Sequence, residues 1–483
     1  MTNQKQRILV VDSEKKLEST IKTLRDNGYI VEVPEPEKSI EIFRRNGFGA
    51  VVTTLREIPQ KVKEIRPKTP VIFFSPSASI DTDTYRLSER GLINDILYPE
   101  LSEPDILESF RKNLLKINVG IVGIGKVGNI TAHELIKENF VEHLYLLGPK
   151  TESNLEKTKP LNDIERIIEE LSRIDGVDPD SLHSCKSIED IIKSDVIVVC
   201  LKSPKYDYRN LPVDENIRRI GLKYDTGSMI NLAKGLKENN YQGTLWLISN
   251  PISEFCNVFL NQGFDPSKIF GSSNDSDRLR TLIRDSLNEG RDIYRIGEED
   301  ILRYYVIGDH RGRAMIPIFS SILIKDPKLR DEHQAVREVP IKKTKLKNRL
   351  GEITHALNMA GIKTIYNYDG SVAPIETASH IGKTLKHILF EPEYPVVVIG
   401  YYPVEKNDPE KDGAFVALPA IFDDKLRIQR IYMPQSVSQK ERERFRKVYE
   451  ENLRFSNFYR DHAKEINANP DNFVKLLSKE NLI

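Results

Sequence analysis

The stretch Asn118–Ile130, NVGIVGIGKVGNI, decides the fold of the central part of this chain. Its first residues are mostly β-branched or small and predict a buried strand. Three glycines, Gly123, Gly125 and Gly128, then follow in the spacing Gly-x-Gly-x-x-Gly, where the strand gives way to a helix. Gly123 permits a tight turn, Gly125 lets the backbone approach a pyrophosphate, and Gly128 allows helix and strand to pack closely. The stretch therefore predicts a dinucleotide-binding turn.

Strands and helices alternate on the carboxyl side of this turn, which is the pattern of a parallel sheet. Strands are predicted at 118–122, 143–147, 195–201 and 244–249, with helices at about 127–138 and 160–174. We expect a doubly wound Rossmann domain over residues 117–264, with a pyrophosphate at the amino end of its first helix.

The expected cofactor is NAD or NADP. In a site for the NAD ribose the second strand ends with an acidic residue, but Gly148 stands at that position. Lys150 close by could accommodate the 2′-phosphate of NADP. Alternatively, Lys150 is a solvated loop residue and the enzyme accepts both cofactors. The predicted cofactor-binding residues are Gly123, Gly125, Lys126, Val127, Gly128, Gly148, Lys150 and Asn250.

Residues 1–116 carry a second parallel α/β pattern. Short β-branched runs at Arg7–Val11, Ile30–Val33, Ala50–Thr53 and Val71–Phe74 alternate with amphipathic stretches such as Leu17–Asn27. On the segments ILVVD, AVVTTL and PVIFFS, residues 6–116 resemble a response-regulator receiver domain. The resemblance implies a flavodoxin-like parallel α/β fold.

The receiver-like segment departs from the phosphorylation chemistry of that family. Receivers carry an acidic pair, a phosphate-accepting aspartate and a lysine before a proline, whereas this chain has Asp12-Ser13, Thr54 and Tyr98-Pro99. Of the usual set, Asp12 and the hydroxyl residue Ser75 remain, so a Mg²⁺-dependent aspartyl phosphate is not expected. We expect a docking or dimerisation module, whose protein partner the sequence does not identify.

After about residue 265 the strand–helix alternation ends. Antiparallel strands are predicted at Tyr304–Ile307, Val396–Gly400 and Gly413–Ile421, followed by a charged amphipathic helix at Gln439–Leu453. Residues 265–455 are expected to form an α+β substrate-binding and catalytic lobe. The segment 456–483 is polar and is predicted to be a weakly periodic tail.

Six segments stand in one order from the glycine turn onwards: GIVGIGKVG, SDVIVVCLKS, a basic loop that ends at Arg218, LISNPIS, FGSSNDSDRLR and YVIGDHRGRAMIP. Several segments in a fixed order are more specific than any one of them. Over residues 117–455 the chain resembles the L-lactate/malate dehydrogenase family. The resemblance implies hydride transfer between a 2-hydroxy acid and a nicotinamide cofactor, no metal ion, and assembly as a homodimer or homotetramer.

The resemblance assigns roles to the residues of the last two segments. His310 matches the histidine that removes the hydroxyl proton, and Asp275 matches the carboxylate that orients it. Arg278 follows Asp275 by three residues, so both fall on one helix face, and it matches the bidentate ligand of the substrate carboxylate. Asp277 between them is expected to be turned elsewhere. Taken singly, such residues are also compatible with an ion pair or a buried structural histidine.

Further substrate-binding residues are expected at a strand end and in a lid. Asn250 matches an amide that contacts substrate and nicotinamide, and Arg218 matches a lid residue that polarises the carbonyl. The lid, Lys202–Arg218, is longer than usual, so Lys205 and Arg209 compete for the specificity position. A cation there favours a dicarboxylate such as oxaloacetate or malate, and a basic solvated loop is the alternative.

Two arginines beside the proposed base are a further departure from the family. Arg311 and Arg313 are expected to lower the pKa of His310 or to bind another anion. Ser371 lies where the family has a small-residue substrate wall. Substrate identity within the 2-hydroxy acids therefore stays open.

Composition limits the partners of the chain. The chain has 72 basic residues (Lys and Arg) and 72 acidic residues (Asp and Glu). Because these charges balance, no net electrostatic field favours binding to nucleic acid or to an anionic membrane. No segment approaches the roughly 18 apolar residues of a membrane helix, and three separated cysteines indicate neither a disulfide framework nor a zinc site. We expect a cytoplasmic protein that acts on a small 2-hydroxy or 2-oxo acid.

Two function classes are compatible with these residues. The leading hypothesis is an NAD(P)-dependent dehydrogenase for malate and oxaloacetate or a related pair. The alternative is a non-catalytic NAD(P)(H)-binding redox sensor, favoured by the degraded receiver residues and by the arginines beside His310. A phosphorelay regulator is the third and weakest hypothesis, because Thr54 cannot accept an acyl phosphate.

Overall fold

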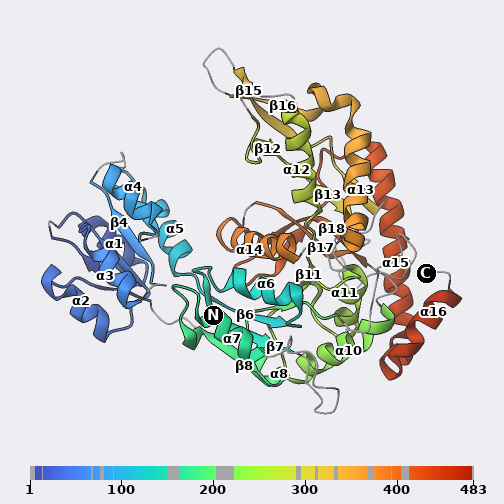
Figure 1. The fold of residues 1–483 in the computed structure, drawn as a ribbon, viewed down its shortest axis with the longest axis horizontal. Coiled ribbons are helices and arrows are strands. Elements are labelled where there is room, and N and C mark those ends of the chain that lie inside the picture. The colour runs from blue at the N-terminus through green and yellow to red at the C-terminus, as the bar shows by residue number, and fades with distance from the viewer. Residues whose placement is uncertain are drawn as a thin grey trace. The chain divides into compact units, whose positions relative to one another are not determined.

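The structure is a computed structural model of the 483-residue chain. It describes residues 6–13, 15–66, 69–76, 81–90, 92–148, 164–202, 222–289, 295–310, 314–330, 336–367, 374–392, 394–403 and 413–480. The chain divides into two compact units (Figure 1). One comprises Met1–Asn118, Leu135–Leu144 and Arg166–His183, and the other comprises Val119–Glu134, Tyr145–Glu165 and Ser184–Ile483.

The amino-terminal part contains a five-stranded sheet in the order β2-β1-β3-β4-β5. All four strand pairings are parallel. The strands are β1 (Arg7–Val11), β2 (Ile30–Glu32), β3 (Ala50–Thr53), β4 (Val71–Phe74) and β5 (Asp95–Leu97). This is the strand order of flavodoxin-like folds, and the predicted parallel α/β pattern is confirmed.

Helices cover both faces of this sheet, and the alternation of side chains along its strands explains why. Ile8 and Val10 of β1 belong to a core shared with α1 (Glu18–Asp26) and α5 (Glu103–Leu114). Leu9 and Val11 point the other way, into a core shared with the next two helices. Those helices are α2 (Pro36–Arg45) and α3 (Ile58–Ile65), and α4 (Thr82–Glu89) follows β4. Because every β1 side chain after Arg7 is buried, the strand reads as a continuous apolar run.

The second sheet begins with six strands in the order β8-β7-β6-β9-β10-β11, which is the 3-2-1-4-5-6 order of a Rossmann fold. The strands are β6 (Ile117–Val122), β7 (Val141–Leu147), β8 (Leu182–Cys185), β9 (Val196–Val199), β10 (Thr244–Leu247) and β11 (Ile269–Gly271). The pairings β6–β9, β9–β10 and β10–β11 are parallel. The associated helices are α6 (Lys126–Leu135), α7 (Ile164–Ser172), α8 (Ile188–Ile191), α10 (Leu222–Glu238) and α11 (Ile252–Asn261). The Rossmann prediction is confirmed, and strand order reverses between β6 and β9, where such folds bind ligands.

Antiparallel strands continue the same sheet beyond β11, which pairs with β17 at Gly271 and Ile399. A Cβ at Gly271 would overlap Ile252 at the start of α11, so a glycine is needed where helix and strand meet. The added strands are β17 (Val396–Pro403), β18 (Gly413–Phe422), β19 (Ile428–Ile431), β13 (Val306–Gly308) and β14 (Met315–Pro317). A separate three-stranded sheet contains β12 (Ile301–Leu302), β15 (Leu323–Arg330) and β16 (Val336–Pro340).

Five helices complete this part of the chain: α12 (Asp275–Asn288), α13 (Leu350–Asn367), α14 (Pro374–Phe390), α15 (Gln439–Ala468) and α16 (Phe473–Lys479). The prediction of a weakly periodic tail after residue 455 was wrong. α15 starts at a capping box between Ser438 and Glu441 and runs on without a break to Ala468. Phe458, Tyr459 and other buried residues of this segment join the core that includes α10 and α11. The apolar stripe is sparse because only one face of a largely charged helix is buried.

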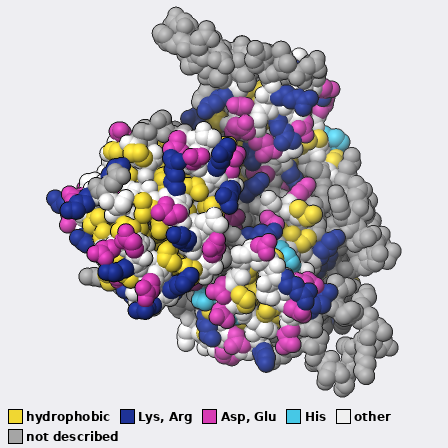
Figure 2. Space-filling model, turned by 60° about the vertical axis from the view of Figure 1, so that its left-hand side comes forward, with side chains coloured by type: hydrophobic (Ala, Val, Ile, Leu, Met, Phe, Trp, Pro, Cys, Tyr) yellow, Lys and Arg dark blue, Asp and Glu magenta, His cyan; other side chains and the backbone are white. Residues whose placement is uncertain are grey.

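Charges of both signs are interspersed on the surface of the described residues, as Figure 2 shows for one face of the molecule. This mixed distribution agrees with the equal numbers of basic and acidic side chains in the sequence. Among the helices of the described ranges, none is long and apolar enough to cross a bilayer.

Candidate active site

The glycine turn lies between β6, which ends at Val122, and α6, which begins at Lys126. Gly123 has φ +93°, and a Cβ there would lie 2.7 Å from the carbonyl carbon of Cys200. A Cβ at Gly128 would overlap the carbonyl oxygen of Gly123, whereas one at Gly125 would meet no described atom within 4 Å. The backbone at Gly125 is therefore open to an approaching group, at the amino end of a helix that favours anions.

Gly148 directly follows β7 and leaves no acidic side chain at the end of that strand. A Cβ at this position would lie 2.9 Å from Cδ1 of Ile164, at the start of α7. A larger residue would have to displace this isoleucine.

Asn250 follows β10 at the carboxyl end of the parallel strands, the edge at which ligands of such folds bind. It is partly exposed and is joined to Pro251 by a cis peptide bond. The next helix, α11, carries the buried Ser253, whose hydroxyl donates to Asp309 Oδ1 over 2.9 Å. Asp309 also accepts from the backbone N–H of His310 over 2.7 Å. These two bonds connect the turn after β10 with the loop that carries His310.

His310 and Asp275 form a buried pair. Nδ1 of His310 lies 2.6 Å from Oδ2 of Asp275, and the two residues are only 7% and 1% exposed. Asp275 is the first residue of α12, where the helix dipole favours a carboxylate. The next residue, Ser276, accepts from the backbone N–H of Val306 over 3.0 Å and so fixes α12 beside β13. A histidine held at Nδ1 in this way is oriented to exchange a proton at Nε2.

Arg278 lies on the same face of α12 as Asp275. Its Nη1 is 3.6 Å from Asp275 Oδ1, and its Nη2 is 3.6 Å from Oε2 of Glu376 at the start of α14. The arginine side chain is only 12% exposed, and within the described part of the chain both terminal nitrogens are buried without a hydrogen-bond acceptor. A buried guanidinium without acceptors is costly unless a ligand supplies them. A carboxylate matches its planar fork.

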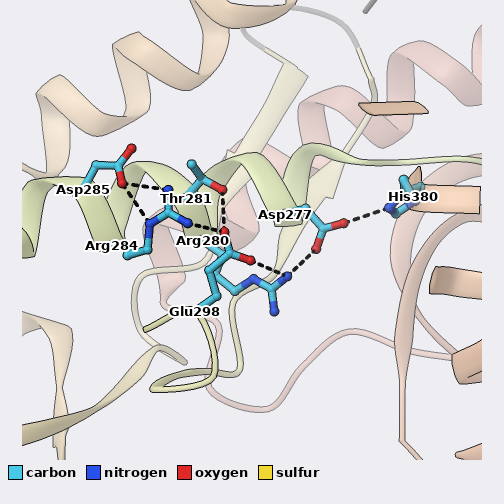
Figure 3. A network of polar contacts seen from close by, with 7 residues as sticks. All are labelled: Asp277, Arg280, Thr281, Arg284, Asp285, Glu298 and His380. Atoms are coloured by element: carbon cyan, nitrogen blue, oxygen red, sulfur yellow. Dashed lines mark hydrogen bonds and ion pairs between the residues drawn. The ribbon is translucent and has the colours of Figure 1, made fainter. Parts of the chain in front are cut away.

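Asp277, the residue before Arg278, contacts a different residue of α14. Figure 3 shows Asp277 Oδ2 facing Nδ1 of His380 on α14, over a distance of 2.9 Å. Burial would raise the pKa of the Asp277 carboxyl, but the hydrogen bond and charge of His380, with Arg280 and Lys383, outweigh it and hold that pKa below its usual value. The same network includes Arg280, which lies 3.4 Å from Asp277 Oδ1 and 3.1 Å from Glu298.

Glu376 and His380 are two further residues near this site that the motifs of the sequence do not identify, although their spacing is a signal. The segment PIETASHIG places them four residues apart on one face of a helix. That face lies against α12, since Glu376 approaches Arg278 and His380 binds Asp277. Their partners lie about 100 residues away in the sequence, so only the folded chain identifies them.

The structure thus brings together His310, Asp275 and Arg278, and connects the turn of Asn250 with the histidine loop through Ser253. Lys126 and Val127 are the first residues of α6. The other predicted positions lie outside the described residues: Lys150, Lys205, Arg209, Arg218, Arg311, Arg313 and Ser371. Among the described residues, no group of three or more His, Cys, Asp or Glu side chains could hold a metal ion.

Comparison with known proteins finds sequence similarity to malate and 2-hydroxycarboxylate dehydrogenases. The chain is 24% identical over 212 residues to a malate dehydrogenase of Sulfolobus acidocaldarius, covering 43% of the chain and 60% of the relative. It is 26% identical over 247 residues to a malate dehydrogenase of Methanothermobacter thermautotrophicus, covering 50% and 68%. A third relative is an L-2-hydroxycarboxylate dehydrogenase (NAD(P)(+)) of Methanocaldococcus jannaschii, 24% identical over 47% of the chain and 66% of that protein. The first of these matches spans less than two thirds of the relative.

Solved structures agree on the fold. Malate dehydrogenase of Cryptosporidium parvum superposes with a TM-score of 0.56 at 17% identity, covering 71% of this chain and 98% of that one. Lactate dehydrogenase of the same organism, complexed with lactic acid and β-nicotinamide adenine dinucleotide, superposes with a TM-score of 0.52 at 19% identity, covering 71% and 97%. No family model matches the chain. The fold of the larger part of the chain is therefore that of malate and lactate dehydrogenases.

Proposed function

We propose that this chain is an NAD(P)-dependent oxidoreductase that interconverts a 2-hydroxy acid and its 2-oxo acid. The observation that carries the proposal is the buried His310–Asp275 pair, 2.6 Å apart, on the same helix end as Arg278. Oxidation of a hydroxy acid requires a base with an orienting carboxylate and a cation that can bind the substrate carboxylate. The terminal nitrogens of Arg278 have no acceptor among the described residues. The names of the relatives support the same reaction.

His310 acts as the acid–base group. Its Nδ1 donates to Asp275, so Nε2 is the nitrogen that takes the proton from the substrate hydroxyl as hydride leaves the carbon. The imidazolium formed in this step lies against the Asp275 carboxylate, which stabilises its charge. In the reverse direction the imidazolium returns the proton to the oxygen of the reduced carbonyl.

Arg278 binds the substrate carboxylate. Both terminal nitrogens are buried, so a bidentate carboxylate would supply the acceptors that the described residues do not. Because Asp275 is three residues away on the same helix, the carboxylate and the reacting hydroxyl would be held at neighbouring points of one surface.

Hydride acceptance is the chemistry that a nicotinamide cofactor supplies when bound. The open backbone at Gly125 and the amino end of α6 fit the pyrophosphate of such a cofactor, and Asn250 lies at the sheet edge where it would extend. Gly148 provides no carboxylate for a ribose diol, so the proposal includes both NAD and NADP. We place malate and oxaloacetate first among substrates because both candidates for the specificity position, Lys205 and Arg209, are cations.

The amino-terminal unit has a separate proposed role. Asp12 accepts hydrogen bonds from the backbone N–H of Leu17 over 2.8 Å and from the hydroxyl of Thr54 over 3.4 Å. Thr54 occupies the strand end where receivers carry their phosphate-accepting aspartate. With Thr54 in place of that aspartate, the proposed module does not accept phosphate and instead docks or dimerises. The altered receiver residues and the arginines beside His310 make a redox sensor the second candidate function. Assembly as a homodimer or homotetramer is part of the same proposal.

A steady-state screen tests the leading function. Purified protein is assayed with oxaloacetate, pyruvate and longer 2-oxo acids, each with NADH and NADPH. We expect turnover of at least one acid, with oxaloacetate preferred, and loss of turnover in His310→Asn with cofactor binding retained. Cofactor binding without turnover of any acid would support the sensor instead, and unchanged turnover in His310→Asn would exclude the mechanism.

A further inference from the structure

Arg278 faces a carboxylate of this chain at the place where a substrate carboxylate would bind. Its Nη2 lies 3.6 Å from Oε2 of Glu376, which is too long for a hydrogen bond but close enough for charge attraction. Asp275 is the second acid near this guanidinium, at 3.6 Å from Nη1. The two acids differ in their environment, because the side chain of Asp275 is 1% exposed and that of Glu376 is 63% exposed.

Glu376 is held near the arginine by its helix. His380 lies four residues further along α14, on the same helix face, and its Nδ1 is 2.9 Å from Asp277 of α12 (Figure 3). This contact fixes the first turns of α14 against the helix that carries Arg278. The Glu376 side chain itself remains exposed, so it can rotate into solvent without unpacking either helix.

A substrate carboxylate on Arg278 would place a third negative group beside one guanidinium. Asp275 cannot withdraw, because it is buried and holds His310. Glu376 is the group that must either move away or repel the incoming anion. Either event costs binding free energy, and neither acts on the proton transfer at His310.

We infer that Glu376 is a displaceable counter-ion that competes with carboxylate ligands for Arg278 and weakens their binding. The inference rests on the proposed function only in taking Arg278 as the carboxylate site. It assigns to α14 a direct effect on substrate affinity, and it predicts that the effect appears in KM rather than in kcat.

The test compares the wild-type chain with Glu376→Gln and with Glu391→Gln. Glu391 is a matched control, because it is also an exposed acid and pairs with His387 at the far end of α14. A separation of 15 positions corresponds to roughly 22 Å along a helix. Affinity for oxalate, a carboxylate without a keto group to reduce, is measured by calorimetry with and without NADH. KM and kcat for oxaloacetate are measured in parallel.

We expect Glu376→Gln to bind oxalate about fivefold more tightly and to lower KM for oxaloacetate by a similar factor, with kcat within about twofold of wild type. The gain should shrink as salt is raised, because an exposed charge is screened. Glu391→Gln should behave as wild type.

Equal oxalate affinity in wild type and Glu376→Gln, an equal gain in Glu391→Gln, or no measurable oxalate binding by any of the three proteins would overturn the inference. Tighter oxalate binding by Glu376→Gln in a protein that reduces no 2-oxo acid would leave the inference standing and exclude the proposed function. Calorimetry therefore tests the inference about Glu376, and the kinetic measurements test the proposed function.

Discussion

Nδ1 of His310 lies 2.6 Å from Oδ2 of Asp275, and these residues come from the loop after β13 and the start of α12. Two further bonds hold the neighbouring segments: the backbone N–H of Val306 donates to Ser276, and Ser253 donates to Asp309. A carboxylate at Nδ1 favours the tautomer that carries its proton on Nδ1. The consequences can be tested one residue at a time.

Replacing Asp275 by Asn should remove the group that orients and stabilises the imidazolium. We expect kcat for oxaloacetate to fall by about 10²-fold to 10⁴-fold, with a much smaller change in KM. Steady-state kinetics measure the effect, and Asp285→Asn is the control, since Asp285 is an exposed acid on the same helix that pairs with Arg284. A fall in kcat of less than threefold for Asp275→Asn would contradict the assigned role.

Replacing Arg278 by Lys should keep the charge but remove the planar fork. Because a lysine cannot bind a carboxylate through two parallel hydrogen bonds, we expect kcat/KM to fall by about 10-fold to 100-fold. Most of the loss should lie in KM. Arg284→Lys, on the same helix with its arginine paired to Glu298, should be close to wild type. Equal kinetics in the two lysine variants would argue against a carboxylate site at Arg278.

Alanine at two positions of the glycine turn should have different consequences. At Gly128 a Cβ overlaps the carbonyl oxygen of Gly123, so Gly128→Ala should lower the free energy of unfolding by about 1–3 kcal/mol. At Gly125 a Cβ meets no described atom within 4 Å, so Gly125→Ala should fold normally. It should nevertheless bind NADH roughly tenfold more weakly, because the methyl group occupies the pyrophosphate approach.

Thermal unfolding and NADH titration by fluorescence distinguish the two glycine variants. A stable Gly128→Ala protein would show that the helix shifts to accept the methyl group. Undiminished NADH affinity in Gly125→Ala would show that the cofactor does not approach the turn at this point.

The Asp277–His380 contact should make stability depend on acid pH. The pKa of Asp277 in the folded chain lies below its ordinary value of 3.8, so folding favours the ionised carboxylate. The stabilisation is fully present above that ordinary value and is lost as pH falls through the lower, folded pKa. Asp277→Asn should therefore reduce the free energy of unfolding by about 1 kcal/mol at neutral pH, a modest effect because the carboxylate is partly exposed.

Urea unfolding at several pH values checks this expectation. The difference between wild type and Asp277→Asn should narrow as the pH falls below about 4. Asp285→Asn again serves as the control, because Asp285 is well exposed. A difference that grows as the pH falls below about 4 would contradict the assigned direction of the pKa shift.

Local sequence patterns were sufficient for most of the elements. The Gly-x-Gly-x-x-Gly spacing predicted the turn between β6 and α6, and the β-branched runs predicted the parallel strands, because a strand buried on both faces has to be apolar throughout. The segment after residue 455 was predicted incorrectly. Its apolar residues are sparse, and their helical period becomes visible only when they are followed continuously from Gln439.

The candidate site was predictable in part. The order of the segments predicts His310, Asp275 and Arg278, and the structure places these three side chains close together. Their roles stay predictions. Glu376 and His380 were not recognised, because neither stands in a motif and each acts through a residue on another helix.

The sequence by itself determined the strand–turn–helix unit, the alternation of elements and the position of the chemical groups along the chain, since these depend on neighbouring residues and on helical or strand periodicity. Three contacts are seen only in the folded chain: β11 pairs with β17, His310 lies beside Asp275, and Glu376 lies near Arg278. Such contacts join residues tens of positions apart. They depend on how whole elements pack, which no local pattern of residues encodes.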